Sequence, residues 1–315
     1  IPAFESYICN LATEECPLPN WEQVGTIDDN GSTSFPWGNR REHSVVAYNN
    51  KLWLMGGFVN SSDVNDVWYS SDGSNWTQAT SSADWSARSG TASLVFDNKM
   101  WILGGGGKND VWYSSDGSNW TQATSGAGWN GRLSHKAVVY NNKMWVMGGG
   151  QSCCSNSSGN LPYHNDVWYS SDGVNWSQAT SSFLVSDSVG GRSDFGLTVF
   201  NNKMWVIGGW GNSSSMPPQP NKSDVWYSTD GSTWTQSTSN LGAGSFGHSA
   251  ASTSSKIWIF GGYYGSSNLS WYSSDGITWT SMNFPSGTYN RSYSNNVFFD
   301  GAIWLAGANK VWKLK

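Results

Sequence analysis

The length, composition and charge of this chain exclude several classes of protein. Its 315 residues, of which 37% are hydrophobic and 15% aromatic, are enough to bury a sizeable core. A formal net charge of −5 offers no positive field for a phosphate backbone, and no stretch reaches the roughly 18 to 20 apolar residues of a membrane span. We therefore expect neither a nucleic-acid partner nor membrane insertion.

Residues 1–19 form a predicted N-terminal arm. The chain begins at Ile1 without methionine and contains four cysteines, which we interpret as marks of a processed, secreted protein. Ten Asn-x-Ser/Thr sequons fit a secreted glycoprotein. Possible glycosylation sites include Asn60, Asn156, Asn212 and Asn268. The cysteines, which allow three pairings, are Cys9, Cys16, Cys153 and Cys154.

An internal repeat runs through the rest of the chain. The sequence NDVWYSSDGSNWTQATS occurs at 65–81 and again at 109–125. Apolar segments that end in Gly-Gly recur at residues 51–57, 99–105, 143–149, 203–209 and 256–262, and a decayed sixth copy, AIWLAGA, lies at 302–308. An alternating segment such as HSVVAYNN precedes each, and DVWYSSDG and NWTQAT follow in most repeats. Each repeat therefore predicts four strands, joined in pairs by tight Asn-, Asp- and Gly-containing turns.

Six such units predict an all-β fold, a six-bladed β-propeller with four antiparallel strands per blade, because a lone blade cannot bury both faces. The last unit stops after its third strand, while NWEQVGT at 20–26 matches the fourth-strand sequence NWTQATS. We therefore expect the N-terminal strand to close the sixth blade. The propeller would span 20–315, with blade 6 split between 20–26 and 291–315.

Arg-x-x-His-Ser, an apolar strand ending in Gly-Gly, and Val-Trp-Tyr recur in this order. The arrangement resembles the kelch repeat of the galactose-oxidase-like propellers over essentially residues 20–315. The SSDGSNW turn resembles a shortened Asp-box, a hairpin motif whose role in other propellers is structural. Kelch propellers include enzymes, lectins and protein-binding modules, so the resemblance leaves the function open.

The predicted topology favours one disulfide pairing. Because the N-terminal arm would enter on the face opposite the long loops, Cys9 is best paired with Cys16. The adjacent Cys153 and Cys154 then form a vicinal disulfide or stay reduced.

Tryptophan separates repeated positions from variable ones. Of the 22 tryptophans, all but four occupy repeat positions in the second, third and fourth strands, where we expect them to pack blade on blade. Exposed loop aromatics are typical of recognition surfaces, so we predict that the remaining four bind ligand. These are Trp37, Trp85 and Trp129 in loops between blades and Trp210 in a loop within blade 4.

Arginine points to the same face of the propeller. One repeat position holds five of the six arginines, namely Arg40, Arg88, Arg132, Arg192 and Arg291. By the resemblance to kelch modules that bind acidic peptides, this position lies at the mouth of the central channel. Neighbouring guanidinium groups roughly 8 Å apart would repel by about 2 kcal/mol. Either an anionic ligand offsets this repulsion or each arginine is bonded within the scaffold, and both interpretations remain open.

Histidines and carboxylates supply further candidates. His43, His135 and His248 recur in alternate blades and could bind a metal ion, although a structural hydrogen bond is the ordinary role of this kelch position. Glu42 and Asp194 each follow a ring arginine by two residues. They could act as an acid–base pair, although salt bridges to arginine are the simpler interpretation.

No Ser-His-Asp arrangement, phosphate-binding glycine loop or galactose-oxidase copper set is found in the sequence, so we expect no cofactor and binding rather than catalysis. The favoured function is lectin-like recognition of a polar or anionic glycan, or of another acidic ligand, at an Arg- and Trp-lined mouth. One alternative is an extracellular structural protein that assembles with copies of itself. The other is an enzyme of the galactose-oxidase-like or sialate-epimerase type.

Overall fold

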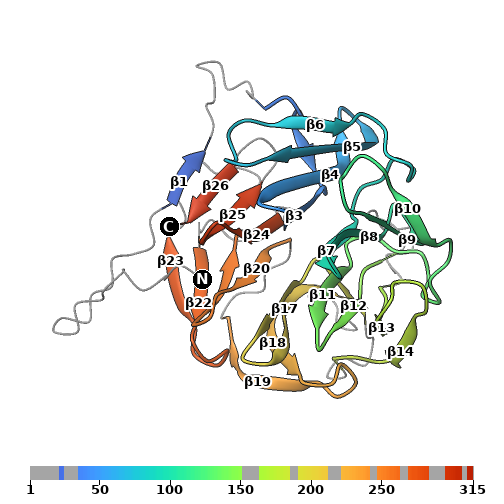
Figure 1. The fold of residues 1–315 in the computed structure, drawn as a ribbon. Helices are drawn as coiled ribbons and strands as arrows, with labels where there is room; N and C mark the ends of the chain where they lie inside the picture. The colour runs from blue at the N-terminus through green and yellow to red at the C-terminus, as the bar shows by residue number, and fades with distance from the viewer. Residues whose placement is uncertain are drawn as a thin grey trace.

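The computed structural model describes residues 21–24, 35–150, 163–184, 191–211, 221–241, 247–262, 269–283, 295–306 and 311–314. Within these ranges the chain forms strands and no helix, and the strands make six sheets arranged around a central axis (Figure 1). The predicted all-β, six-bladed propeller is therefore confirmed. The described residues include no helix that is long and apolar enough to cross a membrane.

Each blade has four antiparallel strands ordered from the axis outward. Blade 1 contains β3 (Ser44–Tyr48), β4 (Lys51–Val59), β5 (Ser62–Ser70) and β6 (Thr77–Thr80). Blade 2 contains β7 (Ala92–Phe96), β8 (Lys99–Gly105), β9 (Lys108–Ser114) and β10 (Thr121–Thr124). Blade 3 contains β11 (Lys136–Tyr140), β12 (Lys143–Met147), β13 (Val167–Ser170) and β14 (Ser177–Thr180).

The second half of the ring repeats this order. Blade 4 contains β16 (Gly196–Phe200), β17 (Lys203–Gly211), β18 (Asn221–Ser228) and β19 (Thr235–Asn240). Blade 5 contains β20 (Ser249–Ser252), β21 (Ile257–Phe260), β22 (Leu269–Ser273) and β23 (Thr280–Asn283). Blades 1 and 4 each add a two-residue strand, β2 (Arg40–Arg41) and β15 (Arg192–Ser193), paired with a lengthened second strand.

The two ends of the chain meet in blade 6. This blade contains β24 (Asn295–Phe299), β25 (Ala302–Ala306), β26 (Val311–Leu314) and β1 (Trp21–Val24). Strand β1 pairs antiparallel with β26, with Trp21 opposite Leu314 and Val24 opposite Val311. The N-terminal strand therefore closes the ring, as the match between 20–26 and the fourth-strand sequence predicted.

Turn chemistry fixes the hairpins within each blade. The Asn49–Asn50 turn between β3 and β4 has φ values of 53° and 55°, which Asn tolerates better than most residues. In the Asp-box-like turn, Asp72 accepts hydrogen bonds from the backbone nitrogens of Ser74 and Asn75, each at 2.8 Å. Slight burial opposes ionisation, but these bonds prevail and lower the pKa of Asp72 to about 2. The twice-repeated seventeen residues are thus third strand, turn and fourth strand.

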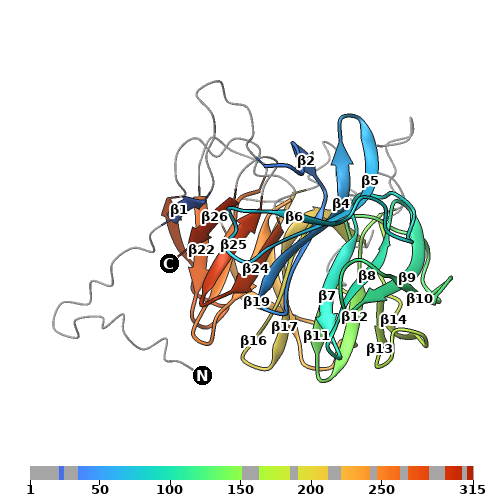
Figure 2. The same ribbon diagram turned by 45° about the horizontal axis from the view of Figure 1, so that its top comes forward.

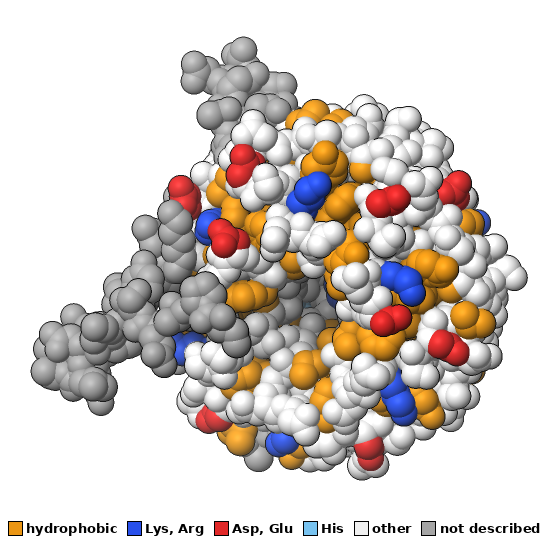
Figure 3. All heavy atoms as spheres, in the orientation of Figure 1, with side chains coloured by type: hydrophobic (Ala, Val, Ile, Leu, Met, Phe, Trp, Pro, Cys, Tyr) orange, Lys and Arg blue, Asp and Glu red, His pale blue; other side chains and the backbone are white. Residues whose placement is uncertain are grey.

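The hydrophobic core lies between blades rather than within them. One cluster joins Trp101 and Leu103 of blade 2 to Met144 and Val146 of blade 3, and corresponding clusters occur at the other blade interfaces. Tryptophans of the second strands also pack on the glycine of the Asp-box-like turn in the next blade, so a methyl group at Gly117 would overlap the Trp53 ring. This packing leaves a central channel, and Figure 3 shows the surface hollowed at the centre of the ring.

Candidate functional site

Four of the five ring arginines lie in the described residues, and all four are buried. Their exposed fractions are 2%, 0%, 0% and 3% for Arg40, Arg88, Arg132 and Arg192. Each forms a two-pronged ion pair with the aspartate at the start of the Asp-Val-Trp motif in its own blade. Arg88 donates to Asp110 Oδ1 at 2.6 Å and Oδ2 at 2.9 Å. The other pairs are Arg40–Asp66, Arg132–Asp166 and Arg192–Asp224.

The arginines also join neighbouring blades. The backbone carbonyl of Arg88 accepts a hydrogen bond from Gly57 of blade 1 at 2.9 Å, while its side chain stays in blade 2. Burial alone would raise the pKa of Asp110, but hydrogen bonds from Arg88 and Trp112 outweigh it and lower that pKa. Of the two interpretations left open, bonding within the scaffold is the one that this geometry supports at these four positions, because aspartates already supply the negative charge.

The sequence contained a sign of this pairing. Blade 5 has Ser245 at the arginine position and Leu269 at the aspartate position, so it lacks both members together. A lone member would leave an uncompensated buried charge, which is strongly destabilising. Arg291 lies outside the described residues.

Three of the four loop tryptophans are also part of the scaffold. Trp37, Trp85 and Trp129 are 2%, 1% and 1% exposed. Trp85 meets the ring of Trp120 edge-on at 5.9 Å, and the other two make the same contact with fourth-strand tryptophans. The prediction that these indoles are exposed is wrong, because their loops fold over the hydrophobic interface between blades. Trp210 differs, because it lies on β17 and is only half-buried.

The three repeat histidines are buried at the blade interfaces. His135 Nε2 lies 2.8 Å from the Leu103 carbonyl of blade 2, and His248 Nε2 lies 2.9 Å from the Ile207 carbonyl of blade 4. Burial lowers the pKa of His43 and of His135 to about 3 and that of His248 to about 4. Within the described part of the chain, no group of three His, Cys, Asp or Glu residues is arranged to hold a metal ion. This geometry fits the structural role considered for these histidines.

A series of backbone hydrogen bonds links blades 1 to 5 at the mouth of the channel. We call its members the collar; they are Glu42, Gly90, Ser134, Asp194 and Gly247, one from each of blades 1 to 5. The backbone nitrogens of the last four members each donate to the carbonyl of the member before, at 2.8 to 3.1 Å. All five have positive φ, between 54° and 67°. The innermost strands begin two residues later, so the collar lies at the end of the channel.

Two collar members carry carboxylates whose surroundings oppose ionisation. Burial and then the charge of Asp194 raise the pKa of Glu42, while Arg41 acts in the opposite direction. Burial also raises the pKa of Asp194, although a 2.8 Å hydrogen bond from Ser193 and the charge of Lys136 oppose it. Glu42 and Asp194 therefore lie within electrostatic reach of each other. The expected salt bridges to Arg40 and Arg192 do not form, because those side chains bind Asp66 and Asp224.

Two raised hairpins flank the collar on opposite blades. We call them the walls; they are the ends of β4 and β5 with β2, and of β17 and β18 with β15. Figure 2 shows the β4–β5 hairpin rising beyond the ring. Phe58 and Trp210 take equivalent positions, opposite Arg41 and Ser193 in the two-residue strands, and both are half-buried. The Arg41 guanidinium lies 4.7 Å from the Phe58 ring centre.

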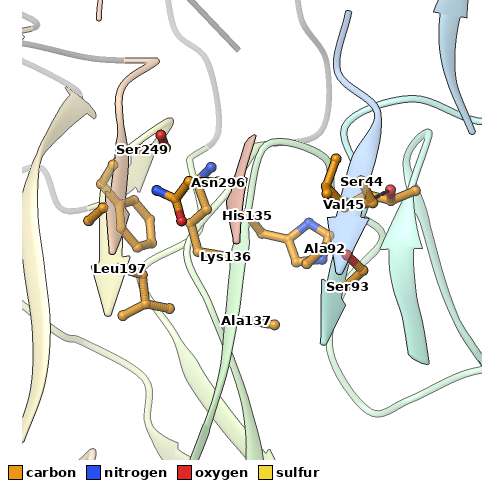
Figure 4. A pocket seen from close by; sticks show the side chains of 13 residues that line it. Ser44, Val45, Ala92, Ser93, His135, Lys136, Ala137, Leu197, Ser249 and Asn296 are labelled. Atoms are coloured by element: carbon orange, nitrogen blue, oxygen red, sulfur yellow. Dashed lines mark hydrogen bonds between the residues drawn. The ribbon is translucent and has the colours of Figure 1, made fainter. Parts of the chain in front are cut away.

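Below the collar, a cavity of about 120 Å³ occupies the channel (Figure 4). All six blades contribute to its lining, and one residue from each is Ser44, Ser93, Lys136, Leu197, Ser249 and Asn296. The lining is mostly small and polar, whereas Lys136 is a charged exception. Sequence reasoning missed Lys136 because it looked like one more polar residue in an alternating strand.

Several predicted positions cannot be compared with the geometry. Asn60 lies at the exposed tip of the β4–β5 hairpin and stays a predicted glycosylation site. The positions outside the described residues are Asn156, Asn212, Asn268, Cys9, Cys16, Cys153 and Cys154.

The fold and the repeated blade contacts define a β-propeller built on a ring of Arg–Asp pairs. A family model described as the KLHDC2/KLHL20/DRC7 Kelch-repeats domain matches residues 6–149, and the Kelch motif matches residues 191–240. The chain is a kelch-repeat propeller, and the galactose-oxidase-like superfamily is its broader fit. No curated protein matched in a sequence search. This class of propeller indicates a binding or protein-interaction role.

Proposed function

We propose that this protein is a secreted binding protein that recognises a polar glycan at the channel mouth, between the walls of blades 1 and 4. The observation that carries the proposal is the arrangement of Phe58 and Trp210 on the walls with Glu42 and Asp194 on the collar. Each wall thus combines an apolar ring with a neighbouring carboxylate. None of these four side chains belongs to the repeated scaffold.

This combination suits a sugar. Aromatic rings offer flat apolar area to the carbon-bound faces of a sugar ring, and carboxylates accept hydrogen bonds from its hydroxyl groups. The ion pairs of the described ring arginines remove the main argument for an anionic ligand. The carboxylates of Glu42 and Asp194 also disfavour an anionic ligand. We therefore favour a neutral glycan over the anionic one expected from the sequence.

Secretion is the second part of the proposal. Four cysteines and ten sequons support it, and Asn60 offers an accessible attachment point at the end of the β4–β5 hairpin. Expression in a glycosylating host should give a chain whose mass falls on amide-glycan removal. The Asn60→Gln variant should lose one glycan, and an unglycosylated secreted product would contradict the use of this site.

A glycan array followed by titration calorimetry tests the ligand. The wild-type protein should bind neutral oligosaccharides, and Trp210→Ala and Glu42→Gln should each weaken binding at least tenfold. The matched control is Ile277→Ala, since Ile277 is 49% exposed on an Asp-box turn away from the collar. No glycan binding by the wild type, or equal binding by Trp210→Ala, would contradict the proposal. Oligomers on sizing would instead favour the self-assembling alternative.

A further inference from the structure

The channel cavity contains a second group of polar side chains, distinct from the walls. We propose that Lys136, Ser249 and Asn296 bind a small oxyanion, a carboxylate or a phosphate, inside the channel. The site lies on β11, β20 and β24, below the collar. It goes beyond the proposed glycan site and does not depend on it.

Lys136 is out of place in the repeat. It pairs with Met147, the residue before the glycines of its second strand, and the same register position carries a small side chain in blades 1, 2, 4 and 5. Those residues are Ser44, Ala92, Gly196 and Ser249. Figure 4 shows Lys136 and Asn296 both entering the cavity. A long cationic side chain thus stands where the scaffold needs only a small one.

The donors in the cavity are unused. The Ser249 Oγ and the Asn296 Nδ2 have no hydrogen-bond partner, and the Ser249 residue is only 6% exposed. Lys136 lines the same cavity, and the charge of Asp194 acts on it. Buried donors without partners are unfavourable, and native proteins usually satisfy them with protein, water or a bound group. Two such donors and a lysine lining one cavity point to an oxygen-rich occupant.

The surrounding charges leave Lys136 as the cation available to that occupant. The neighbouring arginines of blades 3 and 4 are neutralised by Asp166 and Asp224. His135 is buried and uncharged near neutral pH, since its pKa is about 3. Burial lowers the pKa of Lys136 and the charge of Asp194 on the collar opposes this shift, but Asp194 also accepts the Ser193 hydroxyl. Asp194 therefore weakens anion binding without blocking it, and its removal should tighten binding.

The size of the cavity limits the occupant to one small group. About 120 Å³ is below the roughly 300 to 1,000 Å³ of pockets that enclose drug-sized ligands. Acetate or phosphate fits this space, as does the carboxylate of an acidic side chain that reaches in from the mouth.

Calorimetric titration with sodium acetate and sodium phosphate at constant ionic strength tests the site. The wild type should bind at least one of these anions saturably, and Lys136→Ser should weaken that binding at least tenfold. Lys136→Met keeps the length of the side chain without its charge, so it should weaken binding equally while remaining folded. The control Lys143→Ser, in the same blade but outside the cavity, should bind like wild type, and Asp194→Asn should bind severalfold more tightly.

A second arm identifies the source of the anion. If hexaglutamate competes with the bound anion, an acidic side chain can enter the channel; if it does not, the site takes free anions, and either result agrees with the proposal. Absence of saturable acetate and phosphate binding by the wild type would overturn it. Unchanged binding by folded Lys136→Met would overturn it as well.

Discussion

The four Arg–Asp pairs of blades 1 to 4, which we call the Arg–Asp layer, differ from the collar in how their charged groups are stabilised. The arginine of each pair lies only two residues before a collar residue. In the layer, the buried arginine of each of blades 1 to 4 meets its own aspartate through two hydrogen bonds. In the collar, Glu42 and Asp194 occur in single blades, and burial raises the pKa of each. Repetition therefore marks the scaffold of this propeller, and departure from the repeat marks its candidate site.

In blades 1 to 5 the arginine and the aspartate occur together or not at all, and a buried ion pair tolerates replacement of both partners better than loss of one. Removing one partner leaves a buried charge without compensation, whereas apolar replacement of both is often nearly neutral. Blade 5 lacks both charged members and has Ser245 and Leu269 in their places, whereas blade 6 carries Arg291 with Lys310 at the aspartate position.

The largest expected effect comes from breaking one pair. Arg88→Ala should lower the free energy of unfolding by about 3 to 5 kcal/mol, because Asp110 would remain half-buried without its partner. The double variant Arg88→Ser with Asp110→Leu, which copies blade 5, should lose distinctly less. Urea titration measures both. If the free energy of unfolding of the single variant fell by less than about 1 kcal/mol, the pair would not be needed for stability. That result would contradict the distinction between the Arg–Asp layer and the collar.

We expect the loop tryptophans to divide into scaffold residues and ligand-binding residues as well. Trp85→Ala should cost about 3 to 5 kcal/mol of unfolding free energy, because it empties a buried site between blades 1 and 2. Trp210→Ala should change stability by no more than about 1 kcal/mol while abolishing ligand binding. Chemical denaturation gives the first quantity and calorimetry the second. Comparable losses of stability in the two variants would contradict the division into scaffold and site.

The buried histidines should make stability depend on pH. Their folded-state pKa values, from about 3 to about 4, lie below the ordinary value near 6.5. Below about pH 6.5 the unfolded chain therefore binds protons that the folded chain does not, so stability should fall as pH decreases. The slope approaches about 1.4 kcal/mol per pH unit for each histidine. His135→Thr, which copies Thr91 of blade 2, should flatten this dependence in urea titrations from pH 7 to 5; an unchanged slope would show that His135 is not involved.

The smallest expected effect on stability belongs to the collar. Burial and the charge of Asp194 both disfavour ionised Glu42, so Glu42→Gln should leave stability within about 0.5 kcal/mol of wild type or raise it slightly at pH 7. Thermal and urea unfolding would measure this. A loss of 2 kcal/mol or more would place Glu42 in the scaffold.

Much of the fold could be predicted because short stretches of sequence specify the turns and strands of each repeat. Asn49 and Asn50 specify a tight turn, the sequence around Asp72 specifies the Asp-box-like turn, and the segment at 20–26 matches the missing fourth strand of blade 6. These inferences need only neighbouring residues or a comparison between repeats.

The candidate site was harder to predict because its decisive contacts join distant residues. Asp110 follows Arg88 by 22 residues, and the alignment of repeats does not by itself reveal that the two side chains meet. Burial of Trp85 depends on how its loop folds over the next blade. The collar is made by backbone groups and has no side-chain signature, although Glu42 and Asp194 could be singled out as departures from the repeat.

Glycan-array profiles of two variants, both checked for folding, test the central claim most directly. The first is the double variant Arg132→Ser with Asp166→Leu, which removes one ring arginine together with its partner; the second is Trp210→Ala. We predict that the double variant keeps the wild-type profile and that Trp210→Ala loses it. Loss of binding by the folded double variant, with Trp210→Ala unaffected, would return the ligand site to the arginine ring and contradict this account.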